Sequence, residues 1–290
     1  MALQLIDLSL DSPQENLALD EALLLEAESA AAEGRKLGYL RFWESPKHFV
    51  VLGVSCGLEA DAERERCGED GVPILRRASG GGTVLQGPGC LNFTLVLPLG
   101  YSAGLRDINS SYRVILDPCA AALRLDGISM RGSCDLALGG RKFSGSAQKR
   151  SRYCLLHQGT LLYDFSLESI PLYLRQPEKQ PDYREGREHL DFVSNLPLGS
   201  AELRERIAAA LSNQGIAIPE PQGNFVWLAT GEHTVAAGEV LSEHGIVARV
   251  FPGDGIRVSV GEPESVDKLL DATAELVRTL PQGLPSAGLG

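Results

Sequence analysis

The most informative stretch of this chain reads Arg76-Arg77-Ala78-Ser79-Gly80-Gly81-Gly82-Thr83-Val84. Three successive glycines after an apolar run leave backbone N–H groups uncovered and allow positive φ angles. Such a loop can curl around an oxyanion or let a flat ligand approach the backbone closely, and the adjacent arginines supply charge and bidentate hydrogen bonding. A flexible hairpin turn is the plainer alternative. The sequence lacks GxxxxGK followed by Ser or Thr, which excludes a phosphate-binding P-loop.

The stretch between Asp135 and Asp164 contains no acidic residue but five basic ones: Arg141, Lys142, Lys149, Arg150 and Arg152. In a chain of net charge −11 this is a local positive field suited to an anionic ligand such as a nucleotide phosphate, or else a solvated basic face. Lys142 lies in GGRKFSGSAQ, where strand character and flanking glycines predict a side chain that points into a cleft. An ammonium there would stabilise charge that develops on a carboxyl or phosphoryl group, so Lys142 is the candidate catalytic residue.

Cysteine and histidine side chains offer other chemistry. Cys134 precedes Asp135 at the start of an expected strand and is a candidate nucleophile, with a buried structural thiol as the alternative. Cys154 and His157 are three residues apart on an expected strand, so their side chains should point to opposite faces and not meet. His157 opens the segment HQGTLL, either as a residue that lines the site or as a structural one.

Composition bounds the class of protein. With 290 residues, 43% hydrophobic, the chain buries a sizeable core and is long enough for two domains. The net charge of −11 argues against a nucleic-acid or anionic-membrane binder, and no apolar run is long enough to span a membrane. The six cysteines form no CxxC pair and the five histidines no HxxxH set, so we expect reduced thiols and no metal site. The N-terminal residues lack the features of a signal peptide, and we expect a cytoplasmic protein.

The order of the expected elements favours an α+β fold. An N-capped amphipathic helix is expected over 13–34, and a second helix over 108–125. The first 198 residues mix strands and helices without strict βαβ alternation. After Gly199 the pattern changes to a capped helix and short strands, which predicts a second, small α/β domain over 199–290.

Six segments follow one another within residues 1–198: NLALDEALL, LRFW with VVLGVS, RRASGGGTV, LNFTLVLPL, DLALGGRKFSGSAQ and HQGTLL. Together they resemble the catalytic domain of lipoate–protein ligases, in the superfamily shared with biotin ligases and octanoyltransferases. The resemblance implies a lipoate- and biotin-ligase-like α+β domain of mixed sheets with flanking helices. It also implies that ATP, with Mg²⁺, activates lipoate or octanoate to an acyl-adenylate, whose acyl group then passes to a lysine of a lipoyl-carrier domain.

The resemblance also implies roles for single residues. In the family the Gly-rich loop, Ser79 to Val84 here, lines the acyl tunnel and covers the intermediate. Lys142 resembles the family's essential lysine, which holds the activated carboxyl and the α-phosphate. Arg77, Asp135 and His157 stand at positions that line the nucleotide or acyl pocket.

Two departures from the family pattern leave alternatives open. The loop continues as Leu85-Gln86-Gly87, where the family commonly has a His-Asp pair, and Cys134 stands where ligases often carry Asn. Octanoyltransferases use a cysteine nucleophile in place of ATP, so a cysteine-dependent octanoyl or lipoyl transferase acting through Cys134 is the first alternative. A non-catalytic protein that binds the acyl chain is the second.

The rest of the chain carries unrelated motifs, QGNFVWLATGEHT and HGIVARVFPGDGIRVSVGEPES. With their flanking helices they resemble, over residues 200–286, the C-terminal small domain of histidinol-phosphate aminotransferases. The large domain that carries the Schiff-base lysine of that family has no counterpart here. We therefore expect an appended structural module, without pyridoxal phosphate and without transamination.

Overall fold

The computed structural model describes residues 3–212, 225–228, 230–253, 255–259, 268–269, 271–272 and 275–276. The chain divides into two compact units, Met1–Pro219 and Glu220–Gly290. In the first unit helices and strands are mixed without strict βαβ alternation, which confirms the expected α+β class.

A five-stranded sheet in the order β1-β2-β6-β11-β10 is the centre of the first unit. The strands are β1 (Gln4–Asp7), β2 (Tyr39–Trp43), β6 (Cys90–Pro98), β10 (Ser146–Arg150) and β11 (Cys154–Leu162). The pair β1-β2 is parallel, and the other neighbours are antiparallel. All nine residues of β6 are buried, as befits an interior strand covered on both faces.

Two three-stranded sheets carry the segments singled out from the sequence. In the sheet β4-β3-β5 the Gly-rich loop connects β4 to β5, and the sheet β7-β8-β9 carries Asp135 and Lys142. The strands are β3 (Phe49–Leu52), β4 (Ile74–Arg76), β5 (Val84–Gln86), β7 (Ile128–Arg131), β8 (Asp135–Leu138) and β9 (Arg141–Ser144). The end of the loop sequence, Val84–Gln86, was expected as loop; it forms β5 because it pairs with β3.

The helices of the first unit lie between and around these sheets. They are α1 (Pro13–Ala32), α2 (Leu58–Asp61), α3 (Arg64–Glu69), η1 (Ala103–Leu105), α4 (Ile108–Ala122), η2 (Leu167–Ser169), α5 (Ile170–Tyr173), η3 (Asp182–Arg184), α6 (His189–Phe192) and α7 (Ser200–Ser212). The long helix α1 begins as the sequence predicts, since the Ser12 side chain accepts a hydrogen bond from the backbone N–H of Glu15.

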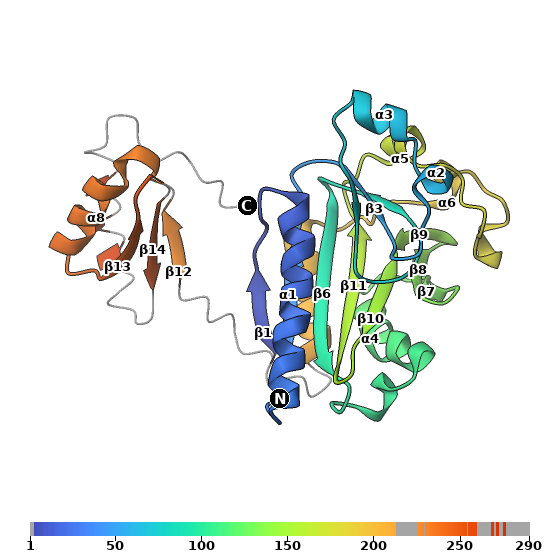
Figure 1. Ribbon diagram of the computed structural model, residues 1–290, viewed down its shortest axis with the longest axis horizontal. Helices are drawn as coiled ribbons and strands as arrows, with labels where there is room; N and C mark the ends of the chain where they lie inside the picture. Colours follow the sequence, from blue (N-terminus) through green and yellow to red (C-terminus); the bar gives the residue numbers. More distant parts are fainter. Residues whose placement is uncertain are drawn as a thin grey trace. The chain divides into compact units, whose positions relative to one another are not determined.

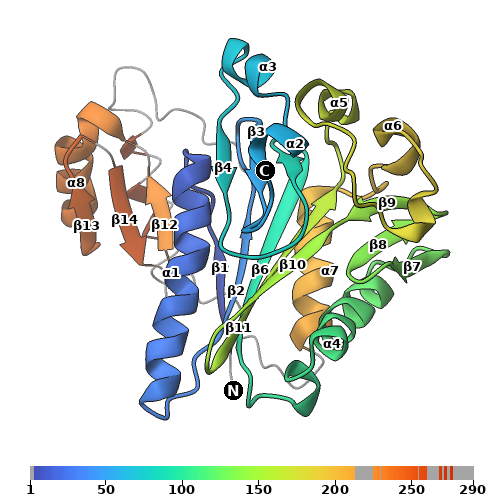
Figure 2. The ribbon, with the colours of Figure 1, turned by 45° about the vertical axis from the view of Figure 1, so that its right-hand side comes forward.

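Helix α1 covers one face of the central sheet, whereas α4 and α7 pack on the other (Figure 1, Figure 2). We call these the α1 face and the α4 face. Successive side chains of a strand alternate between them. On β6, Phe93 and Leu95 join the core formed with α4 and α7, while Val96 packs with α1.

The second unit is described in part. It contains β12 (Phe225–Leu228), η4 (Gly231–His233), α8 (Thr234–Glu243), β13 (Ala248–Phe251) and β14 (Gly255–Ser259). Its sheet has the order β12-β14-β13 and is antiparallel. Ala237 and Leu241 of α8 share a small core with Ile256 and Val258 of β14.

The first compact unit extends beyond the domain boundary expected at 198/199. Helix α7 begins just after that boundary and buries Leu203, Ile207 and Leu211 in the same core as α4. The helix therefore belongs by packing to the first unit. The assignment of 199–290 as a separate domain resembling an aminotransferase stays a prediction.

Candidate active site

The Gly-rich loop is held in shape by the guanidinium group of Arg77. Its Nη2 donates to the carbonyl oxygens of Gly80 and Gly82, at 2.5 and 2.8 Å, and its Nε donates to Ser79 Oγ at 3.1 Å. Nη1 donates to the carbonyl oxygen of Val51 at 3.3 Å. Arg77 is buried, and burial lowers the pKa of its guanidinium. The guanidinium thus donates its hydrogen bonds to the loop and to β3, and the residue holds the loop in its conformation.

Close packing explains why glycines occupy this loop. A Cβ atom on Gly53 of the neighbouring β3 end would lie 2.0 Å from the carbonyl oxygen of Gly81. Gly81 itself has φ +80°, in the left-handed region, and a Cβ there would lie 3.0 Å from Arg77 Nη2. A side chain at Gly53 would force the two backbones apart, and one at Gly81 would strain the backbone and press on Arg77.

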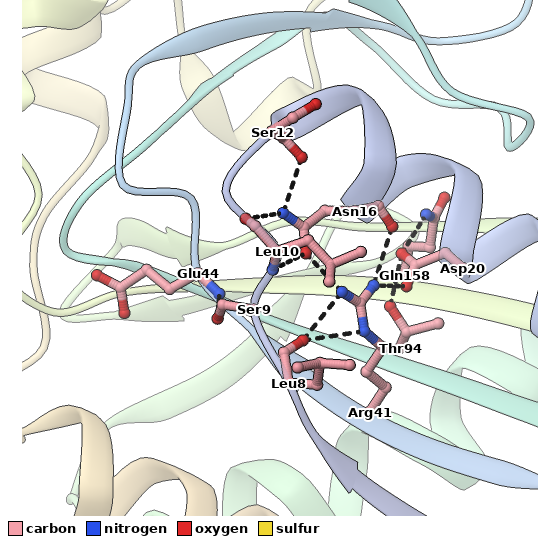
Figure 3. A network of polar contacts seen from close by, with 10 residues as sticks. All are labelled: Leu8, Ser9, Leu10, Ser12, Asn16, Asp20, Arg41, Glu44, Thr94 and Gln158. Atoms are coloured by element: carbon pink, nitrogen blue, oxygen red, sulfur yellow. Dashed lines mark hydrogen bonds and ion pairs between the residues drawn. The ribbon is translucent and has the colours of Figure 1, made fainter. Parts of the chain in front are cut away.

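A buried polar network joins the central sheet to α1 (Figure 3) and continues to the Gly-rich loop through Ser79. Arg41 Nη1 donates to Asp20 Oδ1 at 2.7 Å, and these side chains are 0% and 1% exposed. Asp20 Oδ2 accepts from Thr94 Oγ1 and from Gln158 Nε2, both at 2.8 Å. Burial raises the pKa of Asp20, and the charge of Arg41 and these hydrogen bonds oppose that shift. Because Gln158 Oε1 also accepts from Ser79 Oγ at 2.6 Å, the loop is fixed to α1 through one amide.

Lys142 lies on β9 with its ammonium group beside a carboxylate. Nζ is 2.8 Å from Asp135 Oδ1, and Asp135 Oδ2 accepts from the hydroxyl of Tyr183 at 2.8 Å. A Cβ on Gly145 would lie 3.0 Å from Nζ, so the glycine leaves the space that the ammonium occupies. Burial and the charge of Asp135 raise the pKa of Tyr183, so its hydroxyl keeps the proton and donates a hydrogen bond to the carboxylate.

Two cavities meet at Lys142. The larger cavity, about 590 Å³, extends from the Gly-rich loop toward α5 and α6. The smaller cavity, about 330 Å³, extends over the α1 face of the sheet and is lined there by Asp20, Thr94 and Gln158. Gly81, Gly82, Thr83, Lys142, Gly145 and Thr160 line both. The loop and the lysine that the sequence singled out are thus brought together around one site.

The other basic residues of the acid-free stretch are placed elsewhere. Lys149 forms an ion pair with Glu21 of α1 at 2.6 Å, and the guanidinium of Arg152 lies over the ring of Tyr153. Of the five basic residues only Lys142 lines the two cavities. The stretch therefore does not form a single anion site, because alternation along β10 and the turn after it send its side chains in different directions.

Cys134 lines the smaller cavity as a thiol. Its Sγ donates to the carbonyl oxygen of Ser146 at 3.0 Å. Burial raises the pKa of Cys134, and the charge of Asp135 raises it further. The thiolate that a nucleophilic mechanism needs is therefore disfavoured.

His157 lies on the opposite face of the sheet from both cavities. Its ring packs between Phe93 and Tyr112, with centroids 5.5 and 5.9 Å away, and its Nδ1 is 3.2 Å from Gln148 Nε2. Burial lowers the pKa of His157 to about 3, so the ring is neutral. His157 was expected to line the substrate pocket, and its position in the structure does not fit that expectation. Strand alternation places the side chain of His157 on the α4 face, while that of Gln158 reaches the smaller cavity.

The segment after α5 supplies residues that sequence reasoning missed. Tyr183 donates a hydrogen bond to Asp135, and Lys179 and Arg184 line both cavities, yet the sequence analysis assigns no site to this stretch. Arg184 is buried, with its guanidinium over the ring of Phe192 at 4.7 Å. No local pattern marks these residues. Polar residues inside apolar strand segments, by contrast, were a usable signal for Thr94 and Gln158.

None of the helices that the structure describes is long and apolar enough to cross a membrane. Among the described residues, no three His, Cys, Asp or Glu side chains gather where they could hold a metal ion.

The chain is similar to curated proteins of two kinds. A protein of Aeropyrum pernix named "Putative lipoate-protein ligase A" is 32% identical over 154 residues, which is 52% of this chain and 54% of that protein. An aromatic amino acid aminotransferase of Streptomyces coelicolor is 46% identical over 77 residues, 27% of this chain and 21% of that protein. The chain thus spans about half or less of the length of these relatives.

Solved structures of lipoate ligases share the fold. The bipartite lipoate protein ligase of Thermoplasma acidophilum, studied with its E2 lipoyl domain, matches with a TM-score of 0.62 and 22% identity over 76% of this chain and 86% of that one. A lipoate-protein ligase A bound with ATP matches with a TM-score of 0.60 and 22% identity over 76% of this chain and 88% of that one.

The family model described as "Lipoyl protein ligase A/B catalytic domain" matches residues 12–211. This range holds the central sheet from β2 onward, the Gly-rich loop, Lys142 and helix α7. It confirms the family expected from the six ordered segments. The chain therefore belongs to the lipoyl protein ligase A/B catalytic domain family.

Proposed function

We propose that this protein is an ATP-dependent lipoate–protein ligase, which forms lipoyl-adenylate and transfers the lipoyl group to a lysine of a lipoyl-carrier domain. The observation that carries the proposal is the position of the Lys142 ammonium where two cavities meet. Adenylation brings a carboxylate and an α-phosphate, both negative, to one point, and a cation at that point reduces their repulsion and stabilises the charge of the transition state. Family membership and the ATP-bound and lipoyl-domain-associated neighbours support this reading.

The residues that line the two cavities support a division between the two substrates. The smaller cavity holds the acyl chain across the α1 face, with the carboxylate toward Lys142. The larger cavity holds ATP, and Arg175 and Lys179 in its lining supply further positive charge for the phosphates. The Gly-rich loop borders both and covers the point where they join.

The chemistry proceeds in two displacements. A carboxylate oxygen of the acid attacks the α-phosphorus, the bond from that phosphorus to the bridging oxygen of the β-phosphate breaks, and pyrophosphate leaves. The neutral amine of the acceptor lysine then attacks the acyl carbon, gives up a proton, and AMP leaves with the electron pair of the broken C–O bond. Lys142 donates hydrogen bonds to the reacting carboxyl and phosphoryl oxygens, while Asp135 and Tyr183 keep its ammonium in place.

Mg²⁺ as the companion of ATP fits the residues present. Magnesium is commonly held by one or two carboxylates together with substrate phosphates. Asp61, whose Oδ2 accepts from Thr83 Oγ1 at 2.6 Å, lines the larger cavity, and Asp135 lines the smaller one beside Lys142. Asp61 would hold the ion together with the phosphates, and the ion would shield the phosphate charge. The six free cysteines fit a reducing compartment, and we place the ligase in the cytoplasm.

Mass spectrometry of a lipoyl domain after incubation with lipoate, ATP and Mg²⁺ tests the function. We expect the mass of the domain to rise by one lipoyl group on its acceptor lysine, and no rise when ATP is omitted. Lipoylation that does not depend on ATP would contradict the proposal. Calorimetry that detects lipoate binding without ATP consumption would instead support a non-catalytic acyl-binding protein.

Replacement of the central lysine tests the mechanism, with a second lysine as a matched control. Lys142→Ala should lower the rate of lipoyl-adenylate formation by about 10²–10³-fold, because one preorganised cation is lost from the transition state. Lys149→Ala removes the same charge from an ion pair with Glu21 outside the cavities and should leave the rate near the wild-type value. Equal losses in the two variants would show that general positive charge, and not the position of Lys142, is responsible.

A further inference from the structure

Thr83, at the end of the glycine run, attaches the Gly-rich loop to the wall of the larger cavity. Its Oγ1 donates to Asp61 Oδ2 at 2.6 Å, a distance typical of a charge-assisted hydrogen bond between a hydroxyl group and a carboxylate. Asp61 is the last residue of α2, and both residues line the larger cavity. The bond therefore joins the loop to the side of the site where we place ATP.

The backbone around Asp61 is held by a separate part of the chain. The carbonyl oxygen of Asp61 accepts from the N–H of Arg175 at 3.0 Å, and the N–H of Glu63 donates to the carbonyl oxygen of Tyr173 at 2.9 Å. These two bonds join the chain at the end of α2 to the end of α5. The carboxylate of Asp61 is thus a fixed point, and the loop is the partner that moves when the bond to Thr83 breaks.

Few hydrogen bonds of the described residues hold the loop on the side of the larger cavity. The structure shows the bond from Thr83 to Asp61 and one contact from Cys56 Sγ to the carbonyl oxygen of Gly81, at 3.3 Å. A thiol is a weak donor, so the second contact adds little. The glycines of the loop have no side chain to contribute, and their backbone is conformationally free. Closure of the loop over the larger cavity therefore depends on Thr83.

Closure matters most between the two displacements. The acyl-adenylate is a reactive anhydride, and a closed site protects such an intermediate from water. It must stay bound until the acceptor lysine arrives. A hydrogen bond to a charged group stabilises the closed loop by more than an ordinary hydrogen bond does, so loss of this one should raise the fraction of open loop.

We propose that Thr83 is a positioning residue, whose hydrogen bond to Asp61 keeps the Gly-rich loop closed on the side of the larger cavity and so retains the acyl-adenylate until transfer. The inference rests on the proposed function for the identity of the intermediate. It concerns retention of that intermediate, which the charge of Lys142 by itself does not provide.

Pyrophosphate release without an acceptor tests the retention. With lipoate, ATP and Mg²⁺ but no lipoyl domain, every turnover after the first requires that the enzyme lose its adenylate. Thr83→Val removes the hydroxyl and keeps the shape, and it should raise this steady rate about tenfold, because one hydrogen bond to a charged group is lost. With the lipoyl domain present, fewer domains should be lipoylated per pyrophosphate released. An unchanged rate and an unchanged yield in Thr83→Val would overturn the inference.

Thr83→Ser is the matched control. It keeps the hydroxyl that donates to Asp61 and removes only a methyl group. The rate of adenylate loss in this variant should therefore lie closer to that of the wild type than to that of Thr83→Val. If Thr83→Ser loses adenylate as fast as Thr83→Val does, the methyl group and not the hydrogen bond is responsible, and the inference fails.

The thiol of Cys56 reports on the loop without any substrate. It is half-buried, and its Sγ donates to the loop at Gly81. When the loop opens this contact is lost, so Thr83→Val should speed alkylation of Cys56 by iodoacetamide about threefold or more, as followed by mass spectrometry of the peptide. Cys119, which is 0% exposed in the core beneath α4, should be alkylated no faster. Equal alkylation of Cys56 in the wild type and Thr83→Val would contradict the proposal.

Two substitutions of Asp61 separate the loop from the role of this carboxylate toward Mg²⁺. Asp61→Asn removes the charge, yet its amide oxygen still accepts from Thr83. Asp61→Ala removes the acceptor altogether. We expect alkylation of Cys56 to be faster in Asp61→Ala than in Asp61→Asn. Equal rates in the two variants would show that the hydrogen bond does not hold the loop.

The alkylation assay also separates this inference from the proposed function. If the wild-type protein releases no pyrophosphate with lipoate and ATP, the proposed function fails, and the thiol of Cys56 still decides whether the bond between Thr83 and Asp61 closes the loop. Faster alkylation in both Thr83→Val and Asp61→Ala supports the attachment, and wild-type rates in both overturn it.

Discussion

On the α4 face of the central sheet, Phe93 and Leu95 of β6 pack into a continuous apolar core with α4 and α7. On the α1 face, Asn92 and Thr94 of the same strand line the smaller cavity, and Thr94 donates to Asp20. The four residues are consecutive, and all of them are buried. One strand thus contributes to stability with alternate residues and to the site with the residues between them, because successive side chains point to opposite faces.

The comparison shows where each kind of interaction has its effect. Apolar contacts on the α4 face are many and individually replaceable, since burial of area is not directional. The polar contacts on the α1 face form a connected network from Arg41 through Asp20 and Gln158 to Ser79, in which each group depends on its partner. Substitutions on the two faces should therefore differ in how much they lower the stability, in how that loss depends on pH and in whether a second substitution restores part of it.

Loss of the buried carboxylate of the network should have the largest effect. Asp20→Ala leaves the guanidinium of Arg41 buried without its counter-charge, and we expect the free energy of unfolding to fall by about 3–5 kcal/mol. Urea denaturation measures this change.

A double variant distinguishes an unpaired charge from lost packing. Asp20→Ala combined with Arg41→Met removes both charges, so part of the lost stability should return. A double variant less stable than Asp20→Ala would show that the charge on Arg41 is not the cause.

The histidine of the α4 face should give the next largest effect, through pH. Burial lowers the pKa of His157 to about 3 in the folded protein, from 6.5 in the unfolded chain. Below that upper value the unfolded chain binds a proton that the folded protein does not, so the stability of the fold decreases as the pH falls. The slope from this one group approaches about 1.4 kcal/mol per pH unit.

Urea denaturation of the wild type and of His157→Phe, at pH values from about 7 to about 5, isolates this contribution. The wild type should lose more stability over the range than the variant, which has no group to protonate at that position. Parallel curves would mean that His157 is accessible to protons in the folded protein.

The smallest effect is expected at the thiol of the polar face. Because burial raises the pKa of Cys134 and its Sγ donates to a carbonyl oxygen, Cys134→Ser should change the rate of lipoylation less than about threefold. Incubation of the wild type with octanoyl-carrier protein should give no hydroxylamine-labile acyl adduct. An adduct that forms in the wild type and is lost in Cys134→Ser would favour the cysteine-dependent transferase.

Local patterns predicted much of the fold. The capped helix after Ser12 and the strand that carries Cys154 and His157, β11, agree with the structure, because a cap and an apolar strand segment are features of neighbouring residues. Strand β5 was missed because its pairing with β3 spans residues far apart in the chain. Helix α7 was assigned to the second domain because its apolar stripe does not say which core it joins.

The site was predicted to a similar extent. Glycines that cannot be replaced and a lysine between glycines are local features, so the loop and Lys142 were found. His157 was expected in the pocket because its segment resembles a family motif, yet the face of a strand that becomes the cavity depends on which helix covers it. Tyr183 and Lys179 reach the site from a segment with no motif of its own.

The sequence by itself determined the family, the class of fold, the loop and the central lysine, since six ordered segments and the conformational freedom of glycine are properties of the chain alone. Only the tertiary structure decided that Lys142 stands where two cavities meet and that the other cations of its stretch do not. These outcomes depend on contacts between strands and helices distant in sequence, and such contacts are set by packing, which no local pattern records.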